Sequence, residues 1–340
     1  MMESKKKYFW EVLFLLVIFV GTLYGVFHGE DLGESIAIIK QVNDIYLLPA
    51  VACVVFFIWG ESIIIHYMMG TLKIHLKRWT CFLFSSVGFF FSCITPSASG
   101  GQPAQVYYMK RKNIPIPIST IVLMVITITY KAVLVLIGVA LIIFGQGFIH
   151  KYLMGIMPVF CLGIFLNVGC VALMLILVFD PTLAKKLMNW GLVALEKMHL
   201  VRYKESIHNK LESAMVKYRE SASYFKEKKE VIIHVLLITF AQRIALFIST
   251  YFVYRAFGLD DFSVFTIVML QAVISISVDM LPLPGGMGIT EKLFLTIFVP
   301  VFGVKFLLPG MILSRGLSYY TELILSAVLT IVAHFTIGEE

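Results

Sequence analysis

The chain has 340 residues, of which 59% are hydrophobic and only 14% are charged, and its formal net charge is +7 at pH 7. This composition is too apolar for a soluble globular protein. Apolar runs of about 20 residues, long enough to cross a bilayer core of about 30 Å, recur along the sequence. The composition therefore predicts an all-α polytopic membrane protein. The positive charge does not indicate a nucleic-acid partner, because the basic residues gather beside the apolar runs, where they set topology and meet anionic lipid.

Six apolar runs are long enough to be full spans. They are about Tyr8–Phe27, Tyr46–Met68, Ile118–Phe144, Met154–Phe179, Val231–Tyr254 and Phe306–His334. No small-residue cleavage site follows the first run, so we expect a retained span rather than a signal peptide. The basic residues Lys5, Lys6 and Lys7 precede that run and place the N-terminus in the cytoplasm. The pattern predicts a multi-pass protein of the cell membrane with both termini cytoplasmic.

Two apolar stretches are interrupted by proline and glycine. The run Cys81–Ile94 is short for a span and meets a break at Thr95–Pro103, and the stretch 262–302 is broken at Pro282–Gly288. Proline blocks a helix interior and glycine permits conformations that other residues resist, so each break predicts an opened backbone between two short helices. Within a bilayer, such backbone survives only inside protein or beside a water-filled cavity. We expect two re-entrant elements, and two full crossings by residues 262–302 remain the alternative.

Charge supports the re-entrant interpretation of the first break. If Cys81–Ile94 enters and returns on one side, the basic residues Lys110–Lys112 and the basic segment 180–229 stay cytoplasmic; a full crossing would turn both outward, against the positive-inside rule. Within 181–229, apolar residues recur at spacings of three and four. This spacing predicts basic amphipathic helices at the cytoplasmic surface.

The order span, broken element, span occurs twice, with opposite orientation. We predict one integral membrane domain over residues 1–340, with a first repeat at about 45–145, the cytoplasmic helices at about 181–229 and a second repeat at about 230–335. Inverted repeats with paired broken helices are common in secondary transporters, which bind their substrates where the repeats meet.

Charged residues inside the apolar runs are the first candidate site residues. The cations Lys131, Arg243 and Arg315 lie near the middle of spans, and the acids Asp279 and Glu291 flank the second break. Intramembrane charges are costly and by default mark a functional cavity or a buried pair. The planar fork of arginine suits phosphate, so we expect the cations to hold phosphate. The two acids would balance charge or exchange protons; purely structural pairing with the arginines is the alternative.

The breaks supply the remaining candidates. Gly285, Gly286 and Gly288 would present backbone amides at a helix start, which is an anion site. The first break offers a matching set: Pro96, Ser97, Ser99, Gly100, Gly101 and Gln102. Glu61 and Glu322 lie one or two turns from the predicted span ends, where we expect structural or interfacial roles. No spacing of histidine, cysteine and acids indicates a metal site, and no catalytic, nucleotide or cofactor motif occurs.

Two motifs make the chain similar to a known family. The sequence Pro284–Glu291, followed by Arg315 and Tyr319, resembles the flippase-like membrane region of the lysylphosphatidylglycerol synthase (multiple peptide resistance factor) family. Pro96–Gln105 and the basic segment Tyr108–Asn113 are similar to that family's first-half motif. The similarity extends from about residue 10 to 335. It implies a membrane domain with two re-entrant elements around a cavity for lipid headgroups, with Tyr319 among the headgroup-binding residues.

The resemblance implies movement of a phospholipid or polyprenyl-type lipid, aminoacylated phosphatidylglycerol included, between leaflets. Two departures concern the ligand more than the fold: Gln102 stands where many relatives have an acid, and Lys131 where they tend to have arginine. In two-domain relatives, a soluble aminoacyl-tRNA-dependent transferase follows the membrane region. The chain ends at Glu340, soon after the last span, so we expect no lysyl transfer by this polypeptide alone.

The sequence thus predicts a lipid flippase-like transporter without a cofactor. Its expected partners are membrane lipids, and a separate soluble transferase or a second copy of the chain are further partners to test. A membrane enzyme, or enzyme subunit, that modifies phosphatidylglycerol headgroups is one alternative. A small-solute secondary carrier is the other.

Overall fold

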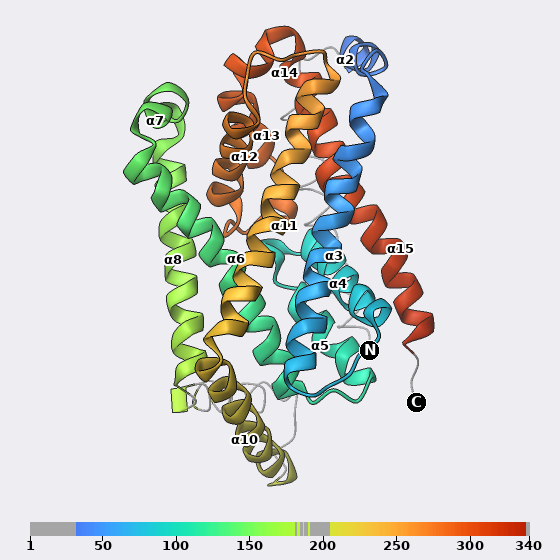
Figure 1. Cartoon of the computed structure of the whole chain (residues 1–340), viewed down its shortest axis with the longest axis vertical. Coiled ribbons are helices and arrows are strands. Elements are labelled where there is room, and N and C mark those ends of the chain that lie inside the picture. Colours follow the sequence, from blue (N-terminus) through green and yellow to red (C-terminus); the bar gives the residue numbers. More distant parts are fainter. Residues whose placement is uncertain (1–31, 181, 184–185, 187–189, 191–204, 338–340) are drawn as a thin grey trace, which may run out of the picture.

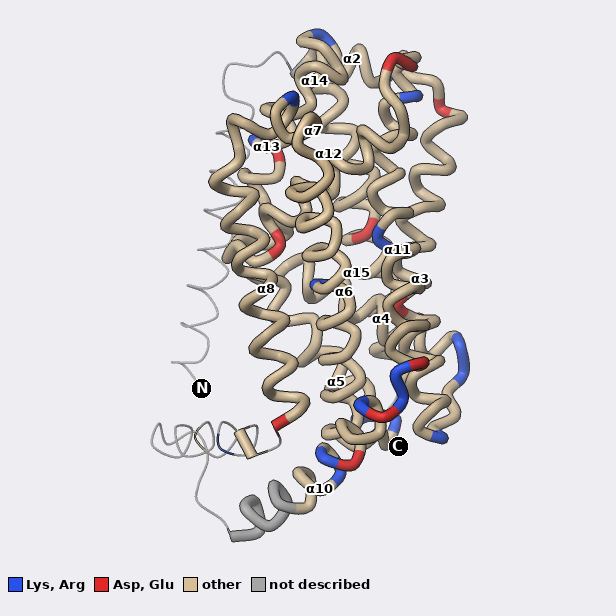
Figure 2. The backbone as a smooth tube through the Cα atoms, turned by 60° about the vertical axis from the view of Figure 1, so that its left-hand side comes forward, with Lys and Arg blue, Asp and Glu red and all other residues tan. Residues whose placement is uncertain are grey.

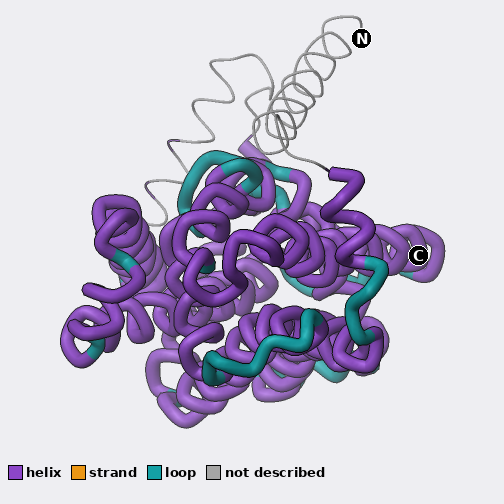
Figure 3. Tube along the Cα trace, turned by 90° about the horizontal axis from the view of Figure 1, so that it is seen from above, coloured by secondary structure: helices purple, strands orange, loops and turns teal. Residues whose placement is uncertain are grey.

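The computed structural model describes residues 32–180, 182–183, 186, 190 and 205–337. Over these residues the secondary structure is helical, and no strand occurs among them (Figures 1 and 3). The predicted all-α class is therefore confirmed. The predicted first span, Tyr8–Phe27, lies outside the described residues.

Within the described residues, five helical segments are long and apolar enough to cross a membrane. They are Asp44–Thr71 (the short η1, Asp44–Tyr46, and α3, Leu47–Thr71), Ile116–Phe144 (α6), Met154–Phe179 (η3, Met154–Ile156, and α8, Met157–Phe179), Lys229–Ala256 (α11) and Val299–Thr336. These segments correspond to the five predicted spans that follow the first. The chain is a multi-pass membrane protein.

The last of these segments begins earlier than predicted. It comprises α14 (Val299–Arg315), a π-helical turn (η5, Gly316–Tyr320) and α15 (Thr321–Thr336). Pro300 occupies the first turn of α14, where its missing N–H costs nothing, so the helix starts there rather than at Phe306. Gly303, at φ 66° and ψ 165°, then kinks it close to the predicted start. The π turn was not foreseen.

Each broken element is a pair of short helices. The first consists of α4 (Arg78–Ile94), the tip η2 (Pro96–Ala98) and α5 (Gly101–Arg111). The second consists of α12 (Val264–Val278), the tip η4 (Pro284–Gly286) and α13 (Ile289–Ile297). The longest of these helices has 17 residues, about 25 Å at 1.5 Å per residue, and is short of the bilayer core.

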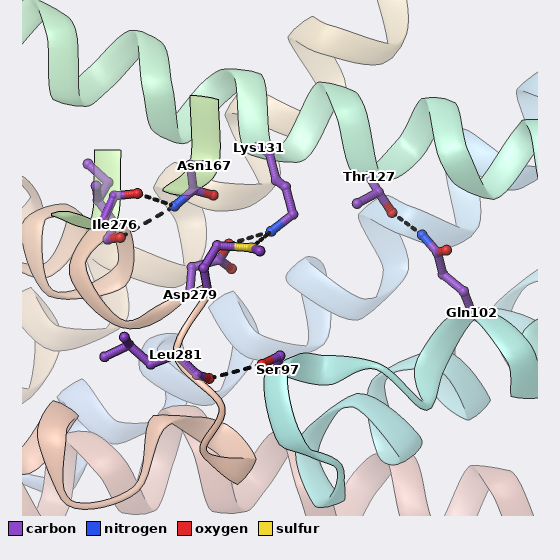
Figure 4. A network of polar contacts seen from close by, with 10 residues as sticks. Ser97, Gln102, Thr127, Lys131, Asn167, Ile276, Asp279 and Leu281 are labelled. Carbon is purple, nitrogen blue, oxygen red and sulfur yellow. Dashed lines mark hydrogen bonds and ion pairs between the residues drawn. The ribbon is translucent and has the colours of Figure 1, made fainter. Parts of the chain in front are cut away.

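The two hairpins enter from opposite ends of the molecule. In Figure 1, α4 and α5 lie in its lower half, and α12 and α13 lie in its upper half. Their tips meet between the ends, where the Ser97 hydroxyl donates to the carbonyl oxygen of Leu281 at 3.2 Å (Figure 4). The stretch after Phe262 forms a hairpin of two short helices, as expected for a re-entrant element, and its second helix ends at Ile297 instead of the expected Phe302.

The two tips follow the same backbone path. Each begins with a proline, and the next two residues have left-handed φ angles: 51° and 54° at Ser97 and Ala98, and 56° and 65° at Gly285 and Gly286. Glycine adopts this conformation freely, whereas residues with a Cβ do so at a cost of about 1–2 kcal/mol. The tips are alike in shape although their sequences differ.

Two large apolar clusters, one toward each end, form most of the core, and a third, small cluster consists of Phe57, Ile58 and Phe89. The lower cluster includes Met68, Phe84 and Ile121, and the upper one includes Phe160 and Phe294, all almost fully buried. Helix α6 contributes to both, so it connects the two halves of the molecule.

Charged residues lie mainly at the two ends, with a few at mid-height (Figure 2). At the upper end are the short helices α2 (Leu32–Ile39) and α7 (Gln146–Tyr152). At the lower end, α10 (Glu205–Glu227) buries Tyr218 and Phe225 in the lower cluster, and the Tyr218 hydroxyl donates to the carbonyl oxygen of Leu177 at 3.1 Å. The predicted amphipathic helix is present for this part of 181–229. Its cytoplasmic placement and the repeat boundaries stay predictions.

Candidate functional site

A cavity of about 470 Å³ lies where the hairpin tips meet, and its walls include residues of both apolar clusters. This volume is in the usual range for a ligand pocket. Many predicted site residues line the cavity: Ser97, Ser99, Gln102, Lys131, Arg243, Asp279, Gly285, Gly286, Arg315 and Tyr319. Glu291, Gly288, Pro96, Gly100 and Gly101 are not among the lining residues.

Lys131 and Asp279 form an ion pair between the two halves. The Lys131 Nζ lies 2.6 Å from Asp279 Oδ2, and both side chains are about nine-tenths buried (Figure 4). Asp279 follows the last residue of α12, and Lys131 comes from the middle of α6. Lys131 is therefore occupied in this conformation, and it would bind another anion only after this pair opens.

Arg315 is held by the second tip. Its Nε donates to Glu291 Oε1 at 2.8 Å and a terminal nitrogen donates to the carbonyl oxygen of Gly285 at 3.0 Å. The other Glu291 oxygen accepts from the Gly288 amide at 2.6 Å, so Glu291 caps the start of α13. The amide expected to face a ligand at Gly288 thus binds the protein's own carboxylate. The pairing of Glu291 with Arg315, weighed above as the structural alternative, occurs.

Arg243 is in a different situation. Its guanidinium carbon lies 3.6 Å from the centre of the Tyr130 ring and 4.7 Å from that of Phe57. Its Nε is buried and has no hydrogen-bond partner. Among the described residues, no ion pair to this guanidinium occurs within 4 Å. Two aromatic rings thus lie against the guanidinium, the side chain lines the cavity, and its Nε has no acceptor within the described part of the chain.

Glu61 and Glu322 also line the cavity, which the sequence analysis did not foresee. Glu61 lies near the middle of the 25-residue α3, and Glu322 follows the π turn. Glu61 Oε1 accepts from the Gln105 amide at 2.6 Å, and Glu322 Oε1 accepts from the Cys93 thiol at 3.5 Å. Both carboxylates are close enough to interact electrostatically with Arg243. Both therefore lie away from the ends of the membrane-spanning segments, near which they were expected.

The first tip is built by close backbone approach. A Cβ at Gly101 would lie 2.1 Å from Ser92 Oγ and 2.7 Å from the Gly88 carbonyl oxygen, so only glycine lets α5 start this close to α4. The Gln102 amide donates to the Thr127 hydroxyl of α6 (Figure 4). Gln102 therefore ties the first hairpin to α6, beside the helix face that carries Lys131.

A tyrosine connects the two halves on the far side of the cavity. Tyr319, on the π turn, donates its hydroxyl to the carbonyl oxygen of Cys93 at 3.0 Å, and its ring lies 4.5 Å from the guanidinium carbon of Arg315. The π turn puts Tyr319 and Glu322 on the cavity side of one helix. Both breaks and both halves thus contribute to one charged, partly aromatic cavity.

Comparison with known proteins agrees with this architecture. The family described as the lysylphosphatidylglycerol synthase TM region matches residues 11–326, nearly the whole chain. The chain belongs to this family. It is also similar to a UPF0104 membrane protein of Methanothermobacter thermautotrophicus, with 23% identity over 295 residues that cover 84% of each chain.

Several of the residues that carried the resemblance to this family line the cavity. Arg315 and Tyr319 line it, and the second tip, with Gly285, forms part of its wall. The residues that sequence reasoning missed are Glu61 and Glu322. Each is an acid in a long apolar run, a signal that makes it a candidate but does not place it at the cavity.

Proposed function

We propose that this family member moves a lipid with a phosphate-bearing headgroup, a phospholipid or a polyprenyl-type lipid, between the two leaflets. The headgroup would pass through the cavity while the acyl chains remain in the bilayer. A polar path lowers the cost of carrying a charge through hydrocarbon. Asp279 and Glu291 would balance charge, since each already pairs with a cation.

One observation carries the proposal: the guanidinium of Arg243 lines the cavity without an ion-pair partner among the described residues. Its planar fork can donate two parallel hydrogen bonds to phosphate oxygens. The rings of Tyr130 and Phe57 orient the guanidinium and leave its edge for a ligand. Lys131, Arg315 and the glycines of the second tip would join the phosphate site when their present partners separate.

A reconstitution experiment tests this proposal. The purified full chain is placed in phosphatidylcholine vesicles with a trace of fluorescent phosphatidylglycerol, and dithionite measures how fast label from the inner leaflet becomes accessible. Arg243→Gln should slow movement by about tenfold to a hundredfold, because charge-assisted hydrogen bonds each contribute about 1.5–3 kcal/mol. Arg243→Lys should be intermediate, since it keeps the charge and loses the fork.

Arg219→Gln, on the exposed surface of α10, is the matched control and should move lipid like the wild type. Unchanged lipid movement in a well-folded Arg243→Gln protein would contradict the assignment. Uptake of soluble phosphate with no lipid movement would favour the small-solute carrier. A new lipid product in vesicles that contain only this protein would favour the enzyme.

A further inference from the structure

We infer that Glu61 and Glu322 form a proton-binding site that couples proton movement to the movement of the lipid. This inference rests on the proposed function and adds an energy source to it. It assigns proton exchange to acids that have no cation bound to them, in place of Asp279 and Glu291, which form ion pairs.

The two carboxylates come from helices far apart in sequence, α3 and α15, and both line the cavity. In the described part of the chain, neither has a cation within 4 Å. Their neighbours are neutral donors, the Gln105 amide and the Cys93 thiol. The absence of a side chain at Gly88 leaves space for Gln105, since a Cβ at Gly88 would lie 2.3 Å from the side-chain amide nitrogen of Gln105. Glu61 and Glu322 are near enough to each other to repel when both are ionised.

The other charged and titratable groups of this cavity come from every helix around it. They are Cys93 on α4, Tyr130 and Lys131 on α6, Cys170 on α8, Arg243 on α11, Asp279 after α12, Arg315 at the end of α14 and Tyr319 on η5. Lys131 is paired with Asp279 and Arg315 with Glu291. Arg243 is thus the cation left to balance Glu61 and Glu322.

A lipid phosphate would change this balance. If it takes the donors of Arg243, the site holds two carboxylates and a phosphate around one guanidinium that has no ion-pair partner among the described residues. Like charges that share such a site cannot all stay ionised, and a proton on Glu61 or Glu322 relieves the repulsion. Lipid binding and proton binding then strengthen each other by the same factor, because linkage is reciprocal.

The geometry favours a proton over a metal cation. Hard metal ions need six or more oxygen ligands in general. Within the described residues, no three or more side chains of histidine, cysteine, aspartate and glutamate come together in a way that could hold a metal ion. Each glutamate already shares an oxygen with a donor, and Arg243 repels a second cation. A proton needs only one free carboxylate oxygen.

The test uses the same vesicles with a pH difference of one unit, the acidic side outside, and the membrane potential clamped. With one proton per lipid, the inner-to-outer ratio of labelled lipid should shift by up to about tenfold, the factor that one pH unit supplies. A trapped pH dye should report proton entry only when transportable lipid is present. The double variant Glu61→Gln/Glu322→Gln should lose the shift and the proton entry. Glu230→Gln, exposed on α11, should keep both.

A second measurement needs no variant. Calorimetric titration of the detergent-purified wild type with dihexanoyl phosphatidylglycerol, in two buffers of different ionisation enthalpy, should show proton uptake on binding. This measurement decides the question if the double variant does not fold.

The outcomes separate the two proposals. Lipid movement that ignores the pH difference, with no proton uptake on binding, overturns the coupling and leaves the proposed function standing. A shift driven by a sodium gradient in place of a pH gradient also overturns it. No lipid movement by the wild type under any gradient overturns the proposed function and the coupling with it.

Discussion

Gly285 satisfies two separate constraints at the second tip. Its φ is +56°, and a Cβ there would lie 2.2 Å from the ring of Tyr319, whose hydroxyl is bound to Cys93. The ring cannot move away without losing that hydrogen bond. Gly258, just past the end of α11, has a φ of +76° but no atom within 4 Å of a built Cβ, so it isolates the cost of a positive φ.

Alanine at these two glycines should therefore have unequal effects. Gly258→Ala should cost about 1–2 kcal/mol of stability through backbone strain alone. Gly285→Ala should cost about 1–3 kcal/mol more, because the methyl group displaces Tyr319. Thermal unfolding in detergent, followed by tryptophan fluorescence, measures both. Equal losses would mean that the contact with Tyr319 does not hold the tip.

The buried pair of Lys131 and Asp279 predicts a non-additive result. Lys131→Met leaves a carboxylate without its partner, which in a fully buried site costs about 3–5 kcal/mol. The loss should be smaller here because both groups line the cavity. Lys131→Met/Asp279→Leu should recover most of the stability.

Lipid movement gives the second readout for this pair. If Lys131 helps to bind phosphate, the double variant should move lipid more slowly than the wild type even though its stability is restored. A double variant that is stable and transports normally would make the pair purely structural. A double variant less stable than the single one would contradict the ion-pair interpretation.

At the scale of elements, the contact between the hairpin tips is the point where the two halves meet across the cavity. The Ser97 hydroxyl and the Leu281 carbonyl join residues 184 positions apart in the sequence. If the halves move against each other to expose the cavity to either leaflet in turn, as the halves of inverted-repeat transporters do, this contact must break.

A reversible crosslink tests that requirement. Ser97→Cys/Leu281→Cys, joined by a short reducible thiol crosslinker, should stop lipid movement, and reduction should restore it. The two single cysteine variants, treated in the same way, control for the native thiols. Transport at the normal rate by the crosslinked protein would show that the tips stay together throughout the cycle.

Much of this element-scale picture could be predicted from the sequence, because proline and glycine act locally. The breaks near Pro96 and Pro284 follow from backbone restrictions on those residues. The placement of Glu61 and Glu322 depends on the register between helices distant in the chain, and on a π turn that shifts the helix face. No local pattern in the sequence specifies either of these. The partner of Lys131 was not predicted for the same reason, whereas the pairing of Arg315 with Glu291 was the structural alternative that the sequence offered.

At the scale of the whole molecule, α7 and α10 mark opposite ends (Figure 1). The basic character of the 180–229 segment predicts that the α10 end faces the cytoplasm. A cysteine introduced at His150 on α7 should then react with a membrane-impermeant maleimide on intact cells, and one at Arg219 on α10 should react only after permeabilisation. Both positions are exposed, and the wild type controls for native cysteines. The reverse labelling pattern would invert the predicted orientation.

The two tips share a backbone path, but they do not share its energetic cost. The second tip places glycine at both left-handed positions, whereas the first places Ser97 and Ala98 there. Each of these two residues raises the energy of the folded tip by about 1–2 kcal/mol. The backbone of the first tip is therefore strained at these two positions, and that of the second tip is not. If the two halves alternate between two conformations, the conformation that strains the first tip would be the less stable one. The protein would then occupy that conformation for less of the time, even without lipid or an ion gradient.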